Sequence, residues 1–273
     1  MSYNWINAED YTMDTLLLFD RWVIRYIMAE NAWYNSGNRS YTTDMAKALS
    51  RYPYVKDFCV KKAPECGNFI KELNAADIGG INETEAREAE ISILQALETF
   101  VVYAYPDVME QADYIRCWNP QRLYELVDLK DKIVLDVGAG TGRLAFAAAK
   151  LAKRVYASEP CDMLREYMRD KIMQDGIKNV RVLDGEAMNL PFEDCTFDVV
   201  TSGHVIGDHY DEEIAEMSRV LKDGGLLVCC NGDDGFRREA PDKELVDRGF
   251  EFFSHETSEG GIVYNYRKTK SAV

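Results

Sequence analysis

The sequence predicts a doubly wound α/β fold, in which a mostly parallel, seven-stranded sheet follows an all-helical N-terminal region. From Lys132 onward, short apolar runs alternate with amphipathic segments, which is typical of parallel strands joined by helices. Before about residue 125, apolar residues instead recur at helical spacing. We therefore expect two domains, 1–125 and 126–273. The chain has 273 residues, of which 47% are hydrophobic, so it can bury a sizeable core.

The N-terminal region is expected to contain several helices. From Thr12 to about Tyr34 apolar residues recur every three or four positions, which predicts one amphipathic helix. Asn82 can cap a long helix that Pro106 stops, because acidic residues that suit a helix N-terminus follow it. The other predicted features are a loop at Asn35–Asn38, a helix at Thr43–Tyr52, a third helical region around Phe69–Leu73 after Pro53 and Pro64, and a short helical stretch within Asp113–Leu129.

A glycine corner follows the first predicted strand, Ile133–Val137, whose apolar run is typical of a strand buried on both faces. The glycines that turn the chain into the next helix are Gly138, Gly140 and Gly142. They permit a tight turn and a close approach of a ligand to the backbone. Asp136 at the strand's end suits a ligand with a cationic group. A dinucleotide fingerprint would need Gly or Ala where this chain has Arg143.

Four more parallel strands and a terminal hairpin complete the predicted sheet. They are Arg154–Pro160, Asn179–Leu183, Phe197–Ser202, Leu226–Cys230, and the pair Phe250–His255 and Ile262–Arg267, with helices at Cys161–Gln174 and Asp211–Leu221. Glu159, at the end of the second strand, lies 21 residues beyond Gly138. An acidic side chain at this point can accept hydrogen bonds from both hydroxyls of a ribose.

Composition excludes several classes of partner. The formal net charge is −15 and neither half of the chain is basic, which argues against nucleic acid and against an anionic membrane surface. The chain has seven cysteines without framework spacing and no secretory leader pattern, so we expect a cytoplasmic protein. No two cysteines have C-x-x-C spacing, and no metal site is predicted.

Residues 132–267 together resemble class I S-adenosylmethionine-dependent methyltransferases, and in particular the small-molecule group that includes the ubiquinone and menaquinone C-methyltransferases. The segments that carry the resemblance are VLDVGAGTGRLA, YASEP, LDGEAMNLPF, FDVVTSGHVIGDH and EMSRVLKDGGLLV. The terminal hairpin is similar to the family's antiparallel last two strands. The resemblance implies a Rossmann-like methyltransferase fold, S-adenosylmethionine as cofactor, and a small-molecule methyl acceptor.

The resemblance also implies roles for individual residues. The three glycines of the corner would cradle the methionine moiety, with Asp136 near its ammonium group, and Glu159 would hold the ribose. Glu186 would accept from the adenine amino group. The other implied cofactor contacts are Gly185, Ala187 and Met188 beside the adenine, Met163 on its other face, and Ser202 and Gly203 beneath the methionine.

The sulfonium methyl is already activated, so the enzyme's task is to align an acceptor and exclude water. A base is needed only if the acceptor must lose a proton. The candidates are His204, Asp208 and His209, which follow the fourth strand. A structural role for these histidines is the alternative, since a lone histidine more often packs than reacts.

Several alternatives remain open from the sequence. The helical region 1–125 is either a lid that contacts the substrate or a core or dimer surface; its aromatic residues Trp22, Trp33, Tyr34 and Trp118 suit either role. The chain could instead be a cofactor-binding module that uses this region to recognise a partner, or an NAD-dependent reductase. The acceptor, the atom methylated and the oligomeric state cannot be identified from the sequence.

Overall fold

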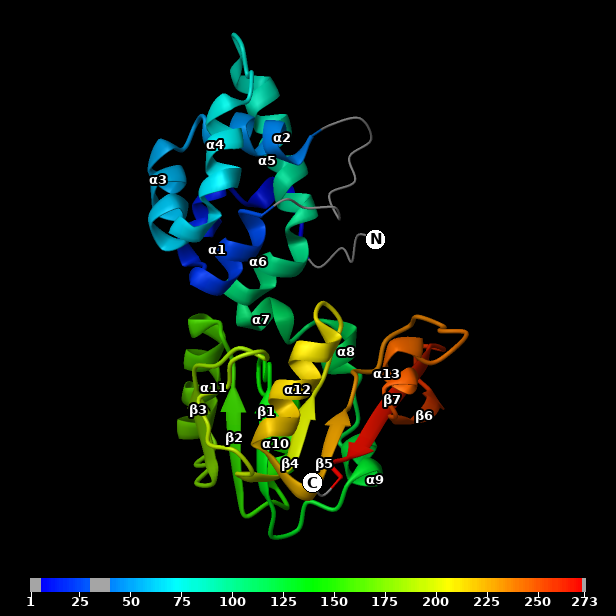
Figure 1. Cartoon of the computed structure of the whole chain (residues 1–273). Coiled ribbons are helices and arrows are strands. Elements are labelled where there is room, and N and C mark those ends of the chain that lie inside the picture. Colours follow the sequence, from blue (N-terminus) through cyan, green and yellow to red (C-terminus); the bar gives the residue numbers. More distant parts are fainter. Residues whose placement is uncertain (1–5, 30–39, 272–273) are drawn as a thin grey trace. The chain divides into compact units, whose positions relative to one another are not determined.

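The computed structural model describes residues 6–29 and 40–271, and the chain divides into two compact units, Met1–Met109 and Glu110–Val273. Figure 1 shows the first unit as helical and the second as a sheet with helices. The division lies before the boundary near residue 125 that the sequence suggested. Trp118 and Leu123 explain the difference, because both side chains are buried in the core around the sheet and bring their helices into the second unit.

The first unit consists of short helices. They are the 3-10 helices η1 (Ala8–Asp10), η2 (Met13–Leu18) and η3 (Pro64–Cys66), and the α-helices α1 (Arg21–Ile27), α2 (Tyr41–Leu49), α3 (Pro53–Lys62), α4 (Gly67–Ala75), α5 (Glu83–Ala96), α6 (Glu98–Ala104) and α7 (Pro106–Met109). In the part of the chain that the structure describes, none of the helices has the length and apolarity needed to cross a membrane.

The single helix predicted from Thr12 to Tyr34 is wrong, since the described part of this segment forms η2 and α1. The backbone is extended at Phe19 and Asp20, and the Asp20 carboxylate caps α1 by accepting from the amides of Trp22 and Val23. The side-chain cap competes with a continuous helix at this point. The predicted loop Asn35–Asn38 and the aromatic residues 33 and 34 lie outside the described residues.

The predicted cap of the long helix is confirmed. Asn82 Oδ1 accepts from the Glu85 amide at 3.0 Å, and the Glu85 carboxylate accepts from the Asn82 amide at 3.1 Å, which forms a capping box. The helix is interrupted at Leu97, which separates α5 from α6. Pro53 and Pro106 each begin a helix, at a position where proline's missing N–H costs nothing.

The second unit contains the predicted seven-stranded sheet, in the order β3-β2-β1-β4-β5-β7-β6 (Figure 1). The strands are β1 (Ile133–Val137), β2 (Arg154–Ser158), β3 (Val180–Leu183), β4 (Phe197–Ser202), β5 (Leu221–Cys229), β6 (Glu251–Glu256) and β7 (Ile262–Thr269). The first five strands pair in parallel. β7 pairs antiparallel with β5, and β6 pairs antiparallel with β7. The helices are α8 (Asp113–Arg116), α9 (Gln121–Leu126), α10 (Arg143–Ala149), α11 (Asp162–Gln174), α12 (Tyr210–Val220) and α13 (Lys243–Asp247).

The strand order determines where a ligand can bind. The chain runs outward from β1 through β2 to β3 and then returns to β4 on the other side of β1. At such a switch point the connections leave the two neighbouring strands in opposite directions, which opens a crevice at their carboxyl ends. Leu135 and Val137 pack into one core cluster and Val134 into another, so β1 is fixed at the centre of the sheet.

Candidate active site

The chain turns sharply between β1 and α10. Gly138, Gly140 and Gly142 have φ angles of 63°, 58° and 95°, a region that costs other residues energy. Space is also restricted, because a Cβ atom on Gly138 would lie 2.4 Å from Val205 and one on Gly142 would lie 2.3 Å from the Phe146 ring. Both positions therefore require glycine, and the loop presents backbone without side chains at the carboxyl end of β1.

Asp136, near the end of β1, is 1% exposed. Its Oδ1 accepts a hydrogen bond from the Thr201 hydroxyl at 3.0 Å, whereas Oδ2 is buried without a hydrogen-bond partner among the described residues. Burial raises the pKa of Asp136 to about 7, although the Thr201 hydroxyl and the Arg143 charge act in the other direction. A ligand that brings an ammonium group would satisfy the unpaired oxygen, so this residue fits the methionine end of S-adenosylmethionine.

Glu159 follows β2 and is 4% exposed. Its carboxylate accepts from two backbone amides, that of Gly140 at 2.8 Å and that of Cys161 at 3.0 Å. The side chain therefore connects the glycine loop to the turn before α11. A carboxylate has about four lone-pair sites, so a group of this kind can accept from amides and from ribose hydroxyls.

The loop after β3 carries the predicted adenine contacts. Gly185 fits closely against β2, since its carbonyl oxygen accepts from the Ser158 hydroxyl at 3.1 Å and a Cβ atom would lie 2.4 Å from that hydroxyl. Glu186 and Ala187 are half-buried. Met163, on α11, is 37% exposed. An exposed thioether on a helix can cover a ring, although none of the described residues makes a contact with Met163 that identifies such a role.

Ser202, the last residue of β4, and Gly203 lie beside the half-buried side chain of Arg143. The guanidinium of Arg143 extends from the start of α10 to the end of β5, where it donates to the Cys230 carbonyl oxygen at 2.9 Å. It also lies over the Trp118 ring at 4.6 Å. A Cβ atom on Gly203 would come within 2.3 Å of this guanidinium, so glycine is required here too. Ser202 is buried, and its hydroxyl contacts the Cys229 thiol.

His204 is held by hydrogen bonds from both its backbone and its ring. Its backbone φ is +60°, its amide donates to Asn231 Oδ1 at 3.2 Å, and its ring Nε2 accepts from the Gly232 amide at 2.9 Å. The Tyr114 ring meets the imidazole edge-on, with ring centroids 5.2 Å apart. The Gly232 hydrogen bond uses the lone pair that a general base would need, which weighs against the base role suggested by the sequence.

Asp208 and His209 are exposed in the loop before α12. The loop is held by Glu213, whose carboxylate accepts from the Gly207 amide at 3.0 Å. The His209 carbonyl oxygen accepts from the Glu213 amide at 2.9 Å and so begins the helix. The imidazole of His209 thus remains solvent-accessible, in contrast to the anchored ring of His204.

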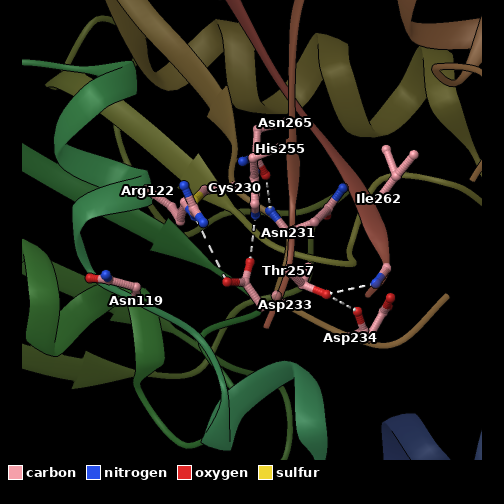
Figure 2. A network of polar contacts seen from close by, with 12 residues as sticks. Asn119, Arg122, Cys230, Asn231, Asp233, Asp234, His255, Thr257, Ile262 and Asn265 are labelled. Carbon is pink, nitrogen blue, oxygen red and sulfur yellow. Dashed lines mark hydrogen bonds and ion pairs between the residues drawn. The ribbon is translucent and has the colours of Figure 1, made fainter. Parts of the chain in front are cut away.

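Sequence reasoning missed the loop Asn231–Asp234, which follows β5 at the same edge of the sheet. Figure 2 shows Asp233 between His255 and Arg122: His255 Nε2 lies 2.7 Å from Oδ1, and Arg122 Nε lies 3.8 Å from Oδ2. The Thr257 hydroxyl donates to the Asp234 carbonyl oxygen at 2.7 Å. The polar run directly after an apolar strand was a usable signal, because parallel strands place their carboxyl ends together.

A cavity of about 290 Å³ lies beside this loop, between the ends of β4, β5 and β7 and the segment 240–242. Val205 lines the cavity and also packs against Gly138, so the cavity adjoins the glycine loop. A larger cavity, of about 620 Å³, lies among α8, α10 and α11 and is lined by Trp118 and Phe146. Of the predicted site residues, it is Gly142 that reaches this second cavity.

Comparison with known sequences shows which proteins the sheet unit resembles. A family model described as a methyltransferase domain matches residues 135–229. A demethylmenaquinone methyltransferase of Lactococcus lactis subsp. lactis (strain IL1403) is 32% identical over 117 residues, which cover 41% of this chain and 46% of the relative. The enzyme of the same name from Staphylococcus aureus (strain MRSA252) is 33% identical over 117 residues, which cover 42% of this chain and 48% of the relative. The match thus spans about half the length of these relatives.

A solved structure shares the fold. The crystal structure of an S-adenosylmethionine-dependent methyltransferase from Aquifex aeolicus superposes with a TM-score of 0.50 and 20% identity, covering 60% of this chain and 96% of the other. At this identity the likeness concerns the fold.

Proposed function

We propose that this chain, which carries a class I methyltransferase domain and resembles the quinone C-methyltransferases, transfers a methyl group from S-adenosylmethionine to a small-molecule acceptor. The observation that carries the proposal is the buried, unpaired Oδ2 of Asp136 beside a glycine loop at the switch point of the sheet. An NAD-dependent reductase is not favoured, because Arg143 occupies the place of the third small residue of the dinucleotide fingerprint.

In this proposal each strand end binds one part of the cofactor. Asp136 pairs with the ammonium group, Glu159 holds the ribose, and Glu186 accepts from the adenine. When bound, the cofactor supplies an electrophilic methyl group on a sulfonium centre. The residues of the chain bind and orient it and keep water away, and alignment contributes much of the acceleration.

The acceptor is proposed to be a small molecule, because the relatives are named for demethylmenaquinone methylation and the chain is strongly acidic. The cytoplasm is the proposed location, which the seven free cysteines support. The helical unit is proposed to provide acceptor contacts. A proton that must leave the acceptor would go to Asp208, to His209 or to water, since the Nε2 lone pair of His204 is occupied.

The test is a screen with S-adenosylmethionine labelled in its methyl group, against extracts and a panel of small acceptors. Incorporation of label that depends on the protein would support the proposal. S-Adenosylmethionine binding without transfer to any acceptor would favour the cofactor-binding module, with the helical unit recognising a partner.

A further inference from the structure

The hydrogen bonds of His204 determine which of its ring nitrogens carries the proton. The Gly232 amide can only donate, and it points at Nε2 at 2.9 Å, so Nε2 must be unprotonated and the proton of the neutral ring lies on Nδ1. Nδ1 has no hydrogen-bond partner in residues 6–29 and 40–271. His204 therefore presents a hydrogen-bond donor that the protein itself does not use.

His204 is one of the residues that line the 290 Å³ cavity next to the glycine loop. Two tyrosines, Tyr264 and Tyr266, line the same cavity and provide flat apolar surface. Arg238, which is paired with Asp234 at 2.7 Å, and Asp242 also line it. The volume is at the lower limit for small-molecule sites, which suits a molecule of about one ring.

Two arginines near the imidazole oppose its protonation, and one of them, Arg238, is paired with Asp234. Crowding by surrounding protein atoms lowers the pKa of His204, and the charges of Arg143 and Arg238 lower it further, against a smaller opposing effect of Asp234. The ring therefore stays neutral near pH 7. The field that disfavours a second proton on the imidazole also favours a negative charge on a ligand beside it.

We propose that His204 is a specificity-determining hydrogen-bond donor, whose Nδ1–H binds an ionised oxygen on a small, single-ring methyl acceptor in this cavity. The proposal rests on the proposed methyltransferase function and specifies the acceptor site. His204 then selects the ionised form of the acceptor, which is the nucleophilic form, and no side-chain base is required.

The reaction balances in this arrangement. An electron pair of the oxyanion, or of a ring carbon conjugated with it, forms the bond to the methyl carbon while the carbon–sulfur pair returns to sulfur. The negative and positive charges cancel as the bond forms. If a ring carbon attacks, its proton is lost to water afterwards.

Two substitutions separate the two nitrogens of His204. In His204→Asn the side-chain amide lies as far along the side chain as Nδ1, so a donor toward the cavity is kept, and Asn tolerates the left-handed backbone at this position. In His204→Gln the amide lies at the distance of Nε2, so the acceptor for Gly232 is kept and the cavity donor is lost. A general base would be lost in both variants, since neither amide takes up a proton.

The probe is 4-nitrophenol, a single-ring compound whose ionised form absorbs visible light, titrated with and without S-adenosylhomocysteine. We expect the wild-type protein to lower the pKa of the bound probe by about one unit, a tenfold preference for the oxyanion. His204→Asn should retain most of this shift and His204→Gln should lose it. Absence of probe binding at millimolar concentration, a shift that persists in His204→Gln, or loss of the shift in both variants would each overturn the proposal.

Calorimetry of S-adenosylhomocysteine with the same three proteins reports separately on the proposed function. If wild type fails to bind it, the methyltransferase function fails, while the probe titration alone still reports on the cavity. Retained S-adenosylhomocysteine binding in both variants verifies that they are folded.

Discussion

The protonation state of Asp136 makes the proposed cofactor site sensitive to pH. Its buried carboxyl has a pKa of about 7, above the usual value for an aspartate, so the native state holds a proton there that the unfolded chain releases above about pH 4. Folding stability contributed by this group is therefore complete below pH 4 and is lost as pH rises through 7. An ammonium group on a bound ligand would lower the pKa of Asp136, because it favours the ionised form of the carboxyl group.

The affinity for S-adenosylhomocysteine should consequently rise with pH. If binding requires ionised Asp136, the association constant increases by roughly eightfold between pH 6 and pH 7.5, and binding releases a proton. Calorimetry in buffers of different ionisation enthalpy measures both quantities. Asp136→Asn is the matched control, and it should bind S-adenosylhomocysteine more weakly and without this pH dependence. If the affinity of both proteins changed equally with pH, Asp136 would not be the residue that pairs with the ammonium group.

Glu159→Ala should weaken cofactor binding by about 1–3 kcal/mol, because the ribose hydroxyls lose their acceptor. The structure adds a second effect. The amides of Gly140 and Cys161 lose their partner as well, so the free energy of unfolding should fall by about 1–3 kcal/mol. Calorimetry and denaturant unfolding separate the two effects. Unchanged cofactor affinity in a folded variant would mean that the carboxylate only holds the loop.

At the scale of single residues, the sequence predicted where site residues lie in the fold better than it predicted which residues contact them. The strand-end carboxylates, Asp136 and Glu159, could be located because a buried strand and a glycine turn fix their place in the chain. The partner of Asp136, Thr201, comes from another strand, and the anchor of His204, Gly232, comes from a loop beyond the next strand. Such contacts depend on register and loop path, which a pattern of apolar residues does not encode.

Among the elements, the loop after β5 organises the edge of the sheet. Asn231 donates hydrogen bonds to β7 and accepts one from the His204 amide after β4. Asp233 contacts His255 of β6 and forms a longer ion pair with Arg122 of α9. Gly232 lies directly against α8, since a Cβ atom there would be 2.1 Å from the Tyr114 carbonyl oxygen. The position of α8 and the anchoring of His204 therefore depend on one glycine.

Gly232→Ala should lower the free energy of unfolding by about 1–3 kcal/mol, because backbone atoms must move to admit the methyl group. Gly207→Ala is the matched control in the loop after β4, where a Cβ atom would meet nothing within 4 Å and φ is not positive. Its effect should be within about 0.5 kcal/mol of zero. Urea unfolding of the two variants is the measurement; equal destabilisation would contradict the close packing of α8.

For the whole molecule, alternating apolar strands and amphipathic helices were enough to predict a seven-stranded α/β unit after a helical region. The sheet order confirms this fold. Boundaries were harder to predict, because side-chain caps and prolines act locally: Asp20 divides one predicted helix in two, and Pro53 starts a helix instead of ending one. The division of the chain depends on Trp118 and Leu123, whose burial against the sheet is a tertiary effect.

The central claim is that the second unit binds S-adenosylmethionine, and the melting temperature tests it most directly. At a hundredfold excess of S-adenosylhomocysteine over its dissociation constant, the native state gains about 2.7 kcal/mol, which for a chain of this size raises the melting temperature by roughly 5–10 °C. NAD at the same concentration serves as the control and should leave the melting temperature unchanged. A flat response to S-adenosylhomocysteine together with a rise in NAD would contradict the account.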